Sequence, residues 1–542
     1  EIPPKFAGQP PVHPDATVLE GGWRGAAGLA EDVRYYGEWM KQEAFRRIGH
    51  LYPKVKDGQG KERTVIAWIW ARTVKCPNPV CGCEMPLASS FVLSKKKGNE
   101  AWVEPIVDGQ KVRFEVHKGK CSKEKESNKT SRSAVFKCPS CGETTLDAYV
   151  KEMGKKSAIG AQLMAVVAEG DRGRIYLSPT AEQETIAAVA MPENYPSGEM
   201  PGNPRWFSPP AFGMTDYADL FTNRQLVALT TFSGLVAEAQ AQVVADGGSE
   251  EYGQAVGVYL AFVVDKLTDY HSSICSWNPP RDGIRNTFGR QAIPMVWDYA
   301  EGNPFSGSSG CFGNMLEWII KCVAELPANQ QGEVSQFDAQ SDCGLRNIMV
   351  STDPPYYDNI GYADLSDYFY VWMRQSLRTT YPELFRTMLV PKAEELIATP
   401  YRFDGSMEQA RAFFEDGMLQ TCKQINKYAQ DDVPVTIYYA YKQSETNDDQ
   451  TASSGWETML SAIIQAGFSI TGTWPMNTER SGRTIGVGTN ALASSIVLVC
   501  RKRPADAPMC TRRDFINTLK RELKPALQKL QASNIAPVDL AQ

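Results

Sequence analysis

Residues 346–359 read Arg-Asn-Ile-Met-Val-Ser-Thr-Asp-Pro-Pro-Tyr-Tyr-Asp-Asn, an apolar run that leads into Asp353-Pro354-Pro355-Tyr356. The run predicts a short strand with the motif at its carboxyl end. Proline has a fixed φ and no N–H, so Pro354 and Pro355 present carbonyl groups without competing donors. A carboxylate and a carbonyl can accept from both N–H groups of a planar amine, and Tyr356 offers a flat face to an unstacked base. The pattern favours methyl transfer to an exocyclic amine over a plain strand-ending turn, which Asp and Pro also form.

The composition is that of a packed globular protein with two or three domains. Of its 542 residues, 42% are hydrophobic and 22% are charged. The sequence has no uncharged apolar stretch of about 18 residues and no secretory signal, so we expect no membrane span and a cytoplasmic location. The chain begins Glu1-Ile-Pro-Pro without an initiator Met. We therefore expect it to be processed, or to be one piece of something larger.

The charge is unevenly distributed along the chain. The net charge is −6, but residues 95–156 hold 15 Lys and Arg against 9 Asp and Glu, a local net charge of +6. Such a patch can meet phosphates, or it can be an ordinary solvated Lys-rich region.

Periodicity and turn signals divide the chain into five expected segments. These are an N-terminal arm and helix (1–60), a zinc-ribbon insert (61–157), a mostly helical region (158–300), an α/β core (301–510) and a C-terminal helix (511–542). In the insert, Asp108-Gly109 predicts a hairpin between 101–107 and 111–117. In the core we expect strands at 332–337, 346–352, 434–441, 467–474 and 494–501, and helices at 363–379, 407–428 and 455–466.

Two paired-cysteine turns predict a metal site. Cys76 and Cys81 flank Pro-Asn-Pro-Val, and Cys138 and Cys141 flank Pro-Ser, with a Gly after each second cysteine. Four thiolates from two tight turns suit tetrahedral, structural Zn²⁺. Cys83 and Cys121 compete as ligands, and we favour Cys81 because Cys81-Gly82 mirrors Cys141-Gly142. The four histidines are scattered, which argues against a His-based metal centre or a Ser-His-Asp hydrolase.

A methyltransferase binds S-adenosylmethionine at the carboxyl ends of parallel strands, usually through a Gly-rich loop. The loop Asn303-Pro-Phe305-Ser-Gly-Ser-Ser-Gly310 is the candidate, but only 42 residues separate Gly310 from Asp353. That interval is short for the strands and helices that should intervene. Asp338, after the expected strand 332–337, is better placed to accept from an adenine amine. On this reading the first two strands and the main Gly-rich loop would lie before residue 1.

The chain resembles the adenine-specific DNA methylases that contain a zinc ribbon, also designated the DUF1156 family. The resemblance spans most of the chain, and its stretches are 1–8, 76–87, 220–225, 286–294, 303–306, 352–367, 391–401, 455–457, 488–493 and 534–542. It implies the α/β, Rossmann-like sheet of S-adenosylmethionine-dependent methyltransferases, here its C-terminal half, with a large inserted zinc-ribbon and helical region. In the family the Gly-rich loop lies upstream of the segment that begins this chain.

The resemblance also implies the activity, transfer of a methyl group to adenine N6 in double-stranded DNA. It places the gene in a bacterial anti-phage or modification locus, with other subunits, or a chain supplying the cofactor loop, as partners. Asp353, Pro354, Pro355 and Tyr356 match the family's catalytic motif, and Cys76, Cys81, Cys138 and Cys141 match its ribbon. We expect target recognition within 76–300, with Arg285, Asn286 and Arg290 as base or phosphate contacts or as structural pairs. Alternatives are another planar acceptor (RNA adenine, cytosine N4, protein glutamine) and a non-catalytic DNA-binding subunit.

Overall fold

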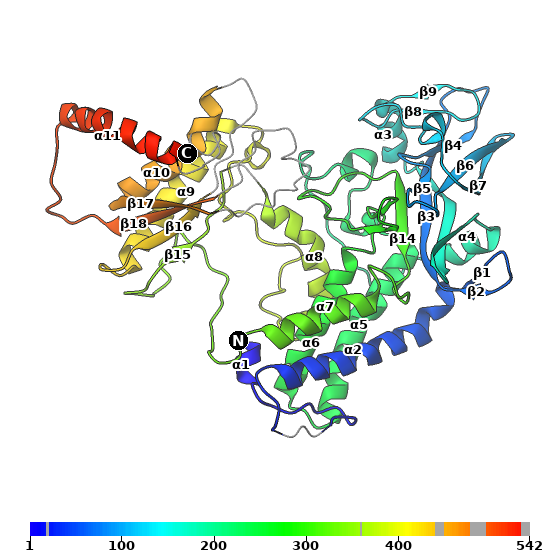
Figure 1. Ribbon diagram of the computed structural model, residues 1–542, viewed down its shortest axis with the longest axis horizontal. Coiled ribbons are helices and arrows are strands. Elements are labelled where there is room, and N and C mark those ends of the chain that lie inside the picture. The colour runs from blue at the N-terminus through cyan, green and yellow to red at the C-terminus, as the bar shows by residue number, and fades with distance from the viewer. Residues whose placement is uncertain (18–20, 358–359, 440–448, 477–494, 533–542) are drawn as a thin grey trace. The chain divides into compact units, whose positions relative to one another are not determined.

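The chain forms two compact units in a computed structural model that describes residues 1–17, 21–357, 360–439, 449–476 and 495–532 (Figure 1). Unit 1 comprises Glu1–Val334 and Tyr362–Pro391, and unit 2 comprises Ser335–Gly361 and Lys392–Gln542. Residues 301–334 and 362–391, which we expected in the α/β core, therefore belong with the N-terminal part of the chain. The resemblance stretches 488–493 and 534–542 and the end of the expected strand 434–441 lie outside the described residues.

Unit 1 contains a layer of long helices that lie side by side (Figure 1). They are α2 (Ala27–Ile48), α5 (Asn223–Ala245), α6 (Glu250–Thr268), α7 (Phe312–Glu325) and α8 (Tyr362–Leu377), with short α1 (Ile2–Lys5), α3 (Asp147–Lys155) and α4 (Ala181–Ala187) elsewhere. Val33, Tyr36, Met40 and Ala44 follow the helical period on one face of α2, and all four are fully buried. A capping box between Thr222 and Gln225 starts α5.

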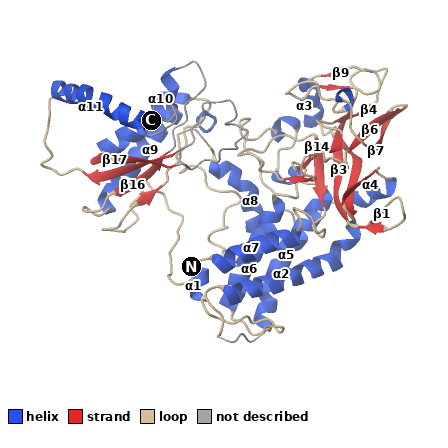
Figure 2. Ribbon diagram, in the orientation of Figure 1, coloured by secondary structure: helices blue, strands red, loops and turns tan. Residues whose placement is uncertain are grey.

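An antiparallel sheet forms the other part of unit 1, shown as red arrows in Figure 2. Its order is β11 (Gly173–Leu177), β10 (Gly160–Gly170), β3 (Val65–Lys75) and β14 (Asp298–Gly302), and β4 (Glu84–Leu87) pairs with the end of β3. Smaller sheets join β5 (Val92–Ser94), β6 (Ala101–Asp108) and β7 (Lys111–Lys118); β1 (Val55–Lys56) and β2 (Glu62–Arg63); β8 (Phe136–Lys137) and β9 (Thr144–Thr145); β12 (Ser276–Asn278) and β13 (Gly283–Arg285). The hairpin predicted at Asp108-Gly109 is present as β6–β7.

Unit 2 contains a four-stranded sheet in the order β15 (Ser351–Thr352), β16 (Val435–Tyr439), β18 (Ser495–Lys502) and β17 (Phe468–Met476). β15 runs parallel to β16, and β18 is antiparallel to both β16 and β17. The carboxyl ends of β15, β16 and β17 therefore share one edge of the sheet. The helices of this unit are α9 (Met407–Tyr428), α10 (Asp449–Gln465) and α11 (Arg512–Ala532), of which α9 and α10 share a core with the sheet.

The prediction of a strand at 332–337 is wrong, because these residues form no strand in the structure. Val334 is 82% exposed and Phe337 is 53% exposed. Neither side chain has the buried partner surface that holds a strand in a sheet. The strand expected at 346–352 is also shorter than predicted, although a parallel bridge between Ile348 and Ala429 extends its pairing.

Candidate functional site

The two cysteine turns have matching backbone geometry. In the first, which follows β3, the N–H groups of Cys81 and Gly82 both donate to the Asn78 carbonyl. In the second, the N–H of Gly142 donates to the Cys138 carbonyl. Gly82 and Gly142 have φ values of +56° and +78°, a left-handed conformation that favours glycine. Each glycine turns the chain so that both cysteines of its pair point to the same side.

The four predicted sulfurs come together. The Sγ atoms of Cys76, Cys81, Cys138 and Cys141 all lie within 4.8 Å of one another. The Cys76–Cys141 sulfur distance is 3.6 Å and the Cys81–Cys138 distance is 3.9 Å. A tetrahedral zinc ion with Zn–S bonds of about 2.3 Å holds its sulfurs roughly 3.8 Å apart. The donor set therefore fits this ion.

The competing cysteines are not in the group that lies within this distance. Cys83 is fully buried and Cys121 is directed to the Ser122 carbonyl. The backbone N–H of Cys83 lowers the pKa of Cys81 to about 7, whereas burial raises the pKa of Cys76 and of Cys138. A metal ligand must be a thiolate, so binding of an ion would release protons from the buried pair.

The Asp-Pro-Pro-Tyr motif lies at the carboxyl end of β15. Ser351 and Thr352 pair with Thr436 and Ile437 of β16, and the chain leaves the sheet directly after them. The Asp353 side chain is exposed there, and the Tyr356 hydroxyl donates to Asp353 Oδ1 at 2.6 Å. The motif therefore presents a solvent-accessible carboxylate beside an aromatic ring at the edge where parallel strands end.

Tyr357, the residue after the motif, holds this loop in place. Its φ is +46°, an uncommon value for a non-glycine residue. Its carbonyl accepts from the Ala398 N–H at 3.0 Å, and its ring packs edge-on against Phe414 at 5.2 Å. The left-handed backbone at Tyr357 turns the chain after the motif, and the buried contacts of its ring offset the conformational strain.

Sequence reasoning missed the aromatic neighbours of Tyr356. The ring of Tyr439, at the end of β16, lies 5.3 Å from the Tyr356 ring, and Trp456 of α10 lies 5.7 Å from Tyr439. The Tyr439 hydroxyl donates to the Gly455 carbonyl at 3.2 Å. The run Tyr438-Tyr439 at a strand end was a usable signal, because parallel neighbours end at the same edge.

The residues expected to bind the cofactor are divided between the two units, and each is engaged within its own unit. Asn303 is buried in unit 1, where its side chain donates to the Val65 carbonyl and accepts from the Phe305 N–H. Phe305 packs in the same unit against Tyr52 and Phe45. Asp338, in unit 2, accepts from the Gln340 N–H in a turn. The strand that was expected to precede Asp338 is absent. These side chains therefore have local structural roles.

The three candidates for nucleic-acid contact divide into two kinds. Asn286 donates to Asp269 Oδ2 at 2.8 Å, which is the structural pairing we kept open for it. Arg285 and Arg290 are exposed, and neither forms an ion pair with another described residue. Both arginines remain accessible to a phosphate.

Comparison with models of protein families, with curated proteins and with solved structures found no match to this chain. None of the helices in the described part of the chain combines the length and the apolar character needed to cross a bilayer.

Proposed function

We propose that this chain holds the acceptor side of an S-adenosylmethionine-dependent methyltransferase that acts on adenine N6 in double-stranded DNA. One observation carries the proposal. The motif Asp353-Pro354-Pro355-Tyr356 stands at the carboxyl end of a parallel strand, with the Asp353 carboxylate exposed and the Tyr356 ring beside it. Ligands of open α/β sheets bind at this edge.

The motif suits a weak nucleophile. The lone pair of an exocyclic amine is delocalised into the ring, so the amine must be drawn toward tetrahedral geometry before it reacts. The Asp353 carboxylate and the Pro354 carbonyl would each accept from one N–H of the amine. Asp353 Oδ1 already accepts from Tyr356, which leaves Oδ2 for the incoming amine. Two preorganised acceptors would raise the nucleophilicity of the nitrogen as positive charge develops on it.

The Tyr356 ring would support the flat base. An adenine inside a duplex is out of reach, so the base must leave its stack and lie against a planar surface. The edge-on packing of Tyr356 against Tyr439 fixes the ring through a residue of the next strand. Position and polarisation of the amine then account for most of the expected acceleration.

The methyl group would come from S-adenosylmethionine, whose sulfonium makes that carbon electrophilic. Asn303 and Phe305 are engaged within unit 1 and Asp338 within unit 2, so we assign none of the three to binding of the donor. The proposal is limited to the acceptor side and leaves the donor side to residues outside those described or to a partner chain.

We further propose that Cys76, Cys81, Cys138 and Cys141 bind one structural zinc ion. The sulfur distances carry this proposal. Four protein ligands fill a tetrahedral shell and leave no open position for a substrate, so the ion would stabilise the ribbon and take no part in methyl transfer.

The test is methyl transfer from labelled S-adenosylmethionine to duplex DNA, RNA and protein, with identification of the labelled product. We expect N6-methyladenine in DNA, and we expect Asp353→Ala to abolish it while DNA affinity changes less than about twofold. Another labelled product, or methylation that survives Asp353→Ala, overturns the assignment. Tight binding of S-adenosylmethionine by this chain in calorimetry would exclude the alternative of a non-catalytic DNA-binding subunit.

A further inference from the structure

Exposed lysines gather at one end of the β5–β6–β7 sheet in unit 1. They come from the loop that joins β5 to β6, from the end of β7 and from the residues directly after it, and they are Lys95, Lys96, Lys97, Lys118 and Lys120. Ala101, the first residue of β6, pairs with Lys118. The Gly119 N–H donates to the Glu100 carbonyl at 2.8 Å. The two lysine segments therefore lie side by side.

A sixth cation joins them from a much later part of the chain. The turn of the β12–β13 hairpin packs against β5, where the Lys95 N–H donates to the Pro279 carbonyl at 3.1 Å. Trp277 Nε1 donates to the Leu93 carbonyl at 2.7 Å, which fixes the hairpin to the same strand. Arg281 lies in this turn and is exposed. It therefore extends the surface that the lysines form.

Acidic residues are scarce in these segments. Residues 95–100, 118–120 and 279–282 contain six Lys and Arg but only two carboxylates, Glu100 and Asp282, so their formal net charge is +4. None of the six cations forms an ion pair with a carboxylate that the structure describes. Charges that have no protein partner at an exposed surface attract anions from solution.

Both of these carboxylates are held by groups other than the six cations. Asp282 is buried, and its Oδ1 accepts from the Ser94 hydroxyl at 2.8 Å and from the Tyr176 hydroxyl at 3.0 Å. Glu100 Oε2 accepts from the Gly98 N–H at 2.9 Å. Their negative charge is already included in the net value, so the surplus of four positive charges remains.

The charges on the adjoining elements do not cancel this surplus. Glu104, further along β6, pairs with Lys125 at 2.6 Å. Asp171, in the turn that leads into β11, pairs with Arg63 at 2.6 Å. The segment 121–126, which follows the last lysine, contains two Lys and two Glu and adds no net charge. The excess is therefore local to the end of the sheet.

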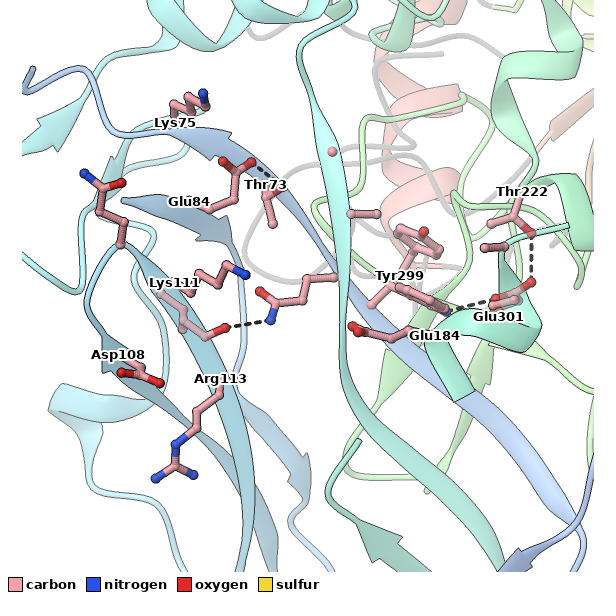
Figure 3. A pocket seen from close by; sticks show the side chains of 18 of the residues that line it. Thr73, Lys75, Glu84, Asp108, Lys111, Arg113, Glu184, Thr222, Tyr299 and Glu301 are labelled. Carbon is pink, nitrogen blue, oxygen red and sulfur yellow. Dashed lines mark hydrogen bonds between the residues drawn. The ribbon is translucent and has the colours of Figure 1, made fainter. Parts of the chain in front are cut away.

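The opposite end of the β6–β7 hairpin, which lines a pocket, is balanced (Figure 3). The charged side chains there are three cations and three carboxylates, Lys75, Lys111, Arg113, Glu84, Asp108 and Glu115. Arg113 pairs with Glu115 at 3.3 Å. One hairpin thus has a neutral end and a cationic end, which allows a comparison within the same element.

We propose that the cationic end, formed by Lys95, Lys96, Lys97, Lys118, Lys120 and Arg281, binds the phosphate backbone of double-stranded DNA. Exposed cations that lie side by side can meet several phosphates of one duplex and release its counter-ions. The three segments contain no aromatic residue on which an unpaired base could stack, so a single strand is the poorer ligand. The inference rests on DNA as the proposed substrate. It concerns unit 1, however, and it needs no methyl transfer.

The experiment measures the affinity of the full chain for a fluorescent DNA duplex of about 20 base pairs, by anisotropy at several salt concentrations. Lys96→Gln with Lys118→Gln removes one charge from each lysine segment. We expect the affinity to fall roughly tenfold and the slope of log affinity against log salt concentration to become shallower by about two. Duplexes of unrelated sequence should lose affinity equally, because phosphates carry no sequence information.

Two further variants serve as controls. Lys111→Gln with Arg113→Gln removes the same number of charges from the balanced end of the hairpin, and its affinity should stay within about twofold of the natural chain. Lys96→Arg with Lys118→Arg keeps the charge and should bind the duplex as the natural chain does. Loss of binding in the arginine variant would assign the effect to altered structure and overturn the proposal.

Three other results overturn the surface. They are unchanged affinity in Lys96→Gln with Lys118→Gln, an equal loss in the glutamine variant of the balanced end, and tighter binding of duplex RNA or an acidic peptide than of DNA. Methylation is measured in parallel. A chain that methylates DNA but shows no effect of the Lys96 and Lys118 changes on affinity refutes only the surface. A chain that binds duplex DNA through this surface but never methylates it refutes only the proposed function.

Discussion

At the scale of single residues, Tyr356 has two separable roles. Its hydroxyl donates to Asp353 and its ring offers a stacking surface. Tyr356→Phe keeps the ring and removes the hydrogen bond, whereas Tyr356→Ala removes both. Stacking of a base is worth about 1–3 kcal/mol. We therefore expect kcat/KM for DNA methylation to fall further in Tyr356→Ala than in Tyr356→Phe, by a factor between about 5 and 150. Equal losses in the two variants would show that the hydroxyl alone matters.

The buried carboxyl group of Asp298 should make the free energy of unfolding depend on pH. Burial raises its pKa to about 6, while its Oδ1 accepts from the Ser89 N–H. Because the folded pKa lies above the unfolded value, the group favours folding below about pH 4, and this contribution is lost as the pH rises to about 6. Asn at this position keeps an acceptor and cannot ionise.

We therefore expect Asp298→Asn to gain stability relative to the natural chain between pH 4 and pH 7, by about 3 kcal/mol at most. Urea unfolding at both pH values measures this difference. His271, whose pKa burial lowers to about 4, is common to both proteins and cancels in the comparison. A difference that is constant with pH would mean that Asp298 does not titrate in this window.

The sequence predicted the residues whose chemistry depends on local spacing. The four cysteine ligand candidates come together because each pair is set by its own turn, and Cys81 is in the group while Cys83 is not. Asn303 and Phe305 resembled part of a cofactor loop, but Asn303 closes a contact to β3. That contact joins positions more than 200 residues apart, and no local pattern specifies such a pairing.

At the scale of elements, the proposed zinc site leads us to expect a clear difference between neighbouring cysteines. We expect one zinc ion per purified chain, and loss of that ion together with a lower melting temperature in Cys138→Ser. Cys83→Ala is the control, because Cys83 lies two residues from a ligand but outside the group of four. Elemental analysis and thermal unfolding measure both effects. Zinc retained in Cys138→Ser, or lost equally in Cys83→Ala, would contradict the ligand set.

The hydrogen bonds of Thr222 at the start of α5 should contribute to the stability of unit 1. Thr222 accepts from the Gln225 N–H, and its hydroxyl donates to Glu301. Thr222→Ala removes both bonds and should destabilise unit 1 by about 1–2 kcal/mol. Thr222→Ser keeps the oxygen and should stay within about 0.5 kcal/mol of the natural chain. Chemical unfolding distinguishes the two; equal destabilisation would assign the effect to the Thr222 methyl group.

Elements with strong local signals were predictable, and those that depend on distant partners were not. The helix expected at 407–428 matches α9, and the Asp108-Gly109 hairpin is present with Gly109 at φ +60°. β10 was missed because its sequence, with three alanines, one Leu and one Met, resembles a buried helix. Its pairing between β3 and β11 makes it a strand.

At the scale of the whole molecule, we expect two unfolding transitions, one for each unit. Each has its own buried core, so a single two-state transition is not expected. Ile69→Ala in β3 should lower only the transition of unit 1, and Ile437→Ala in β16 only that of unit 2, by about 2–4 kcal/mol each. Chelation of zinc should act like Ile69→Ala. Calorimetry resolves these changes, and one transition shifted equally by both variants would show that the units unfold together.

The division into units was beyond sequence reasoning. The helix expected at 363–379 is present as α8, and its period correctly indicates a buried face. That face, with Tyr368 and Trp372, packs against Phe221 of unit 1. Amphipathic spacing shows that a helix is covered but does not specify the surface that covers it.

The discontinuity of unit 2 has a consequence for how the protein is made. About 80 residues separate β15 from its partner β16, and a ribosome adds roughly 5–20 residues per second. The strand before Asp353 therefore waits several seconds for a neighbour, and during this time residues 362–391 can join the part of unit 1 that has already been synthesised. The sheet closes only after β18 has emerged, more than 140 residues after β15. The Asp-Pro-Pro-Tyr loop thus reaches its final shape only after strands that are synthesised well after it.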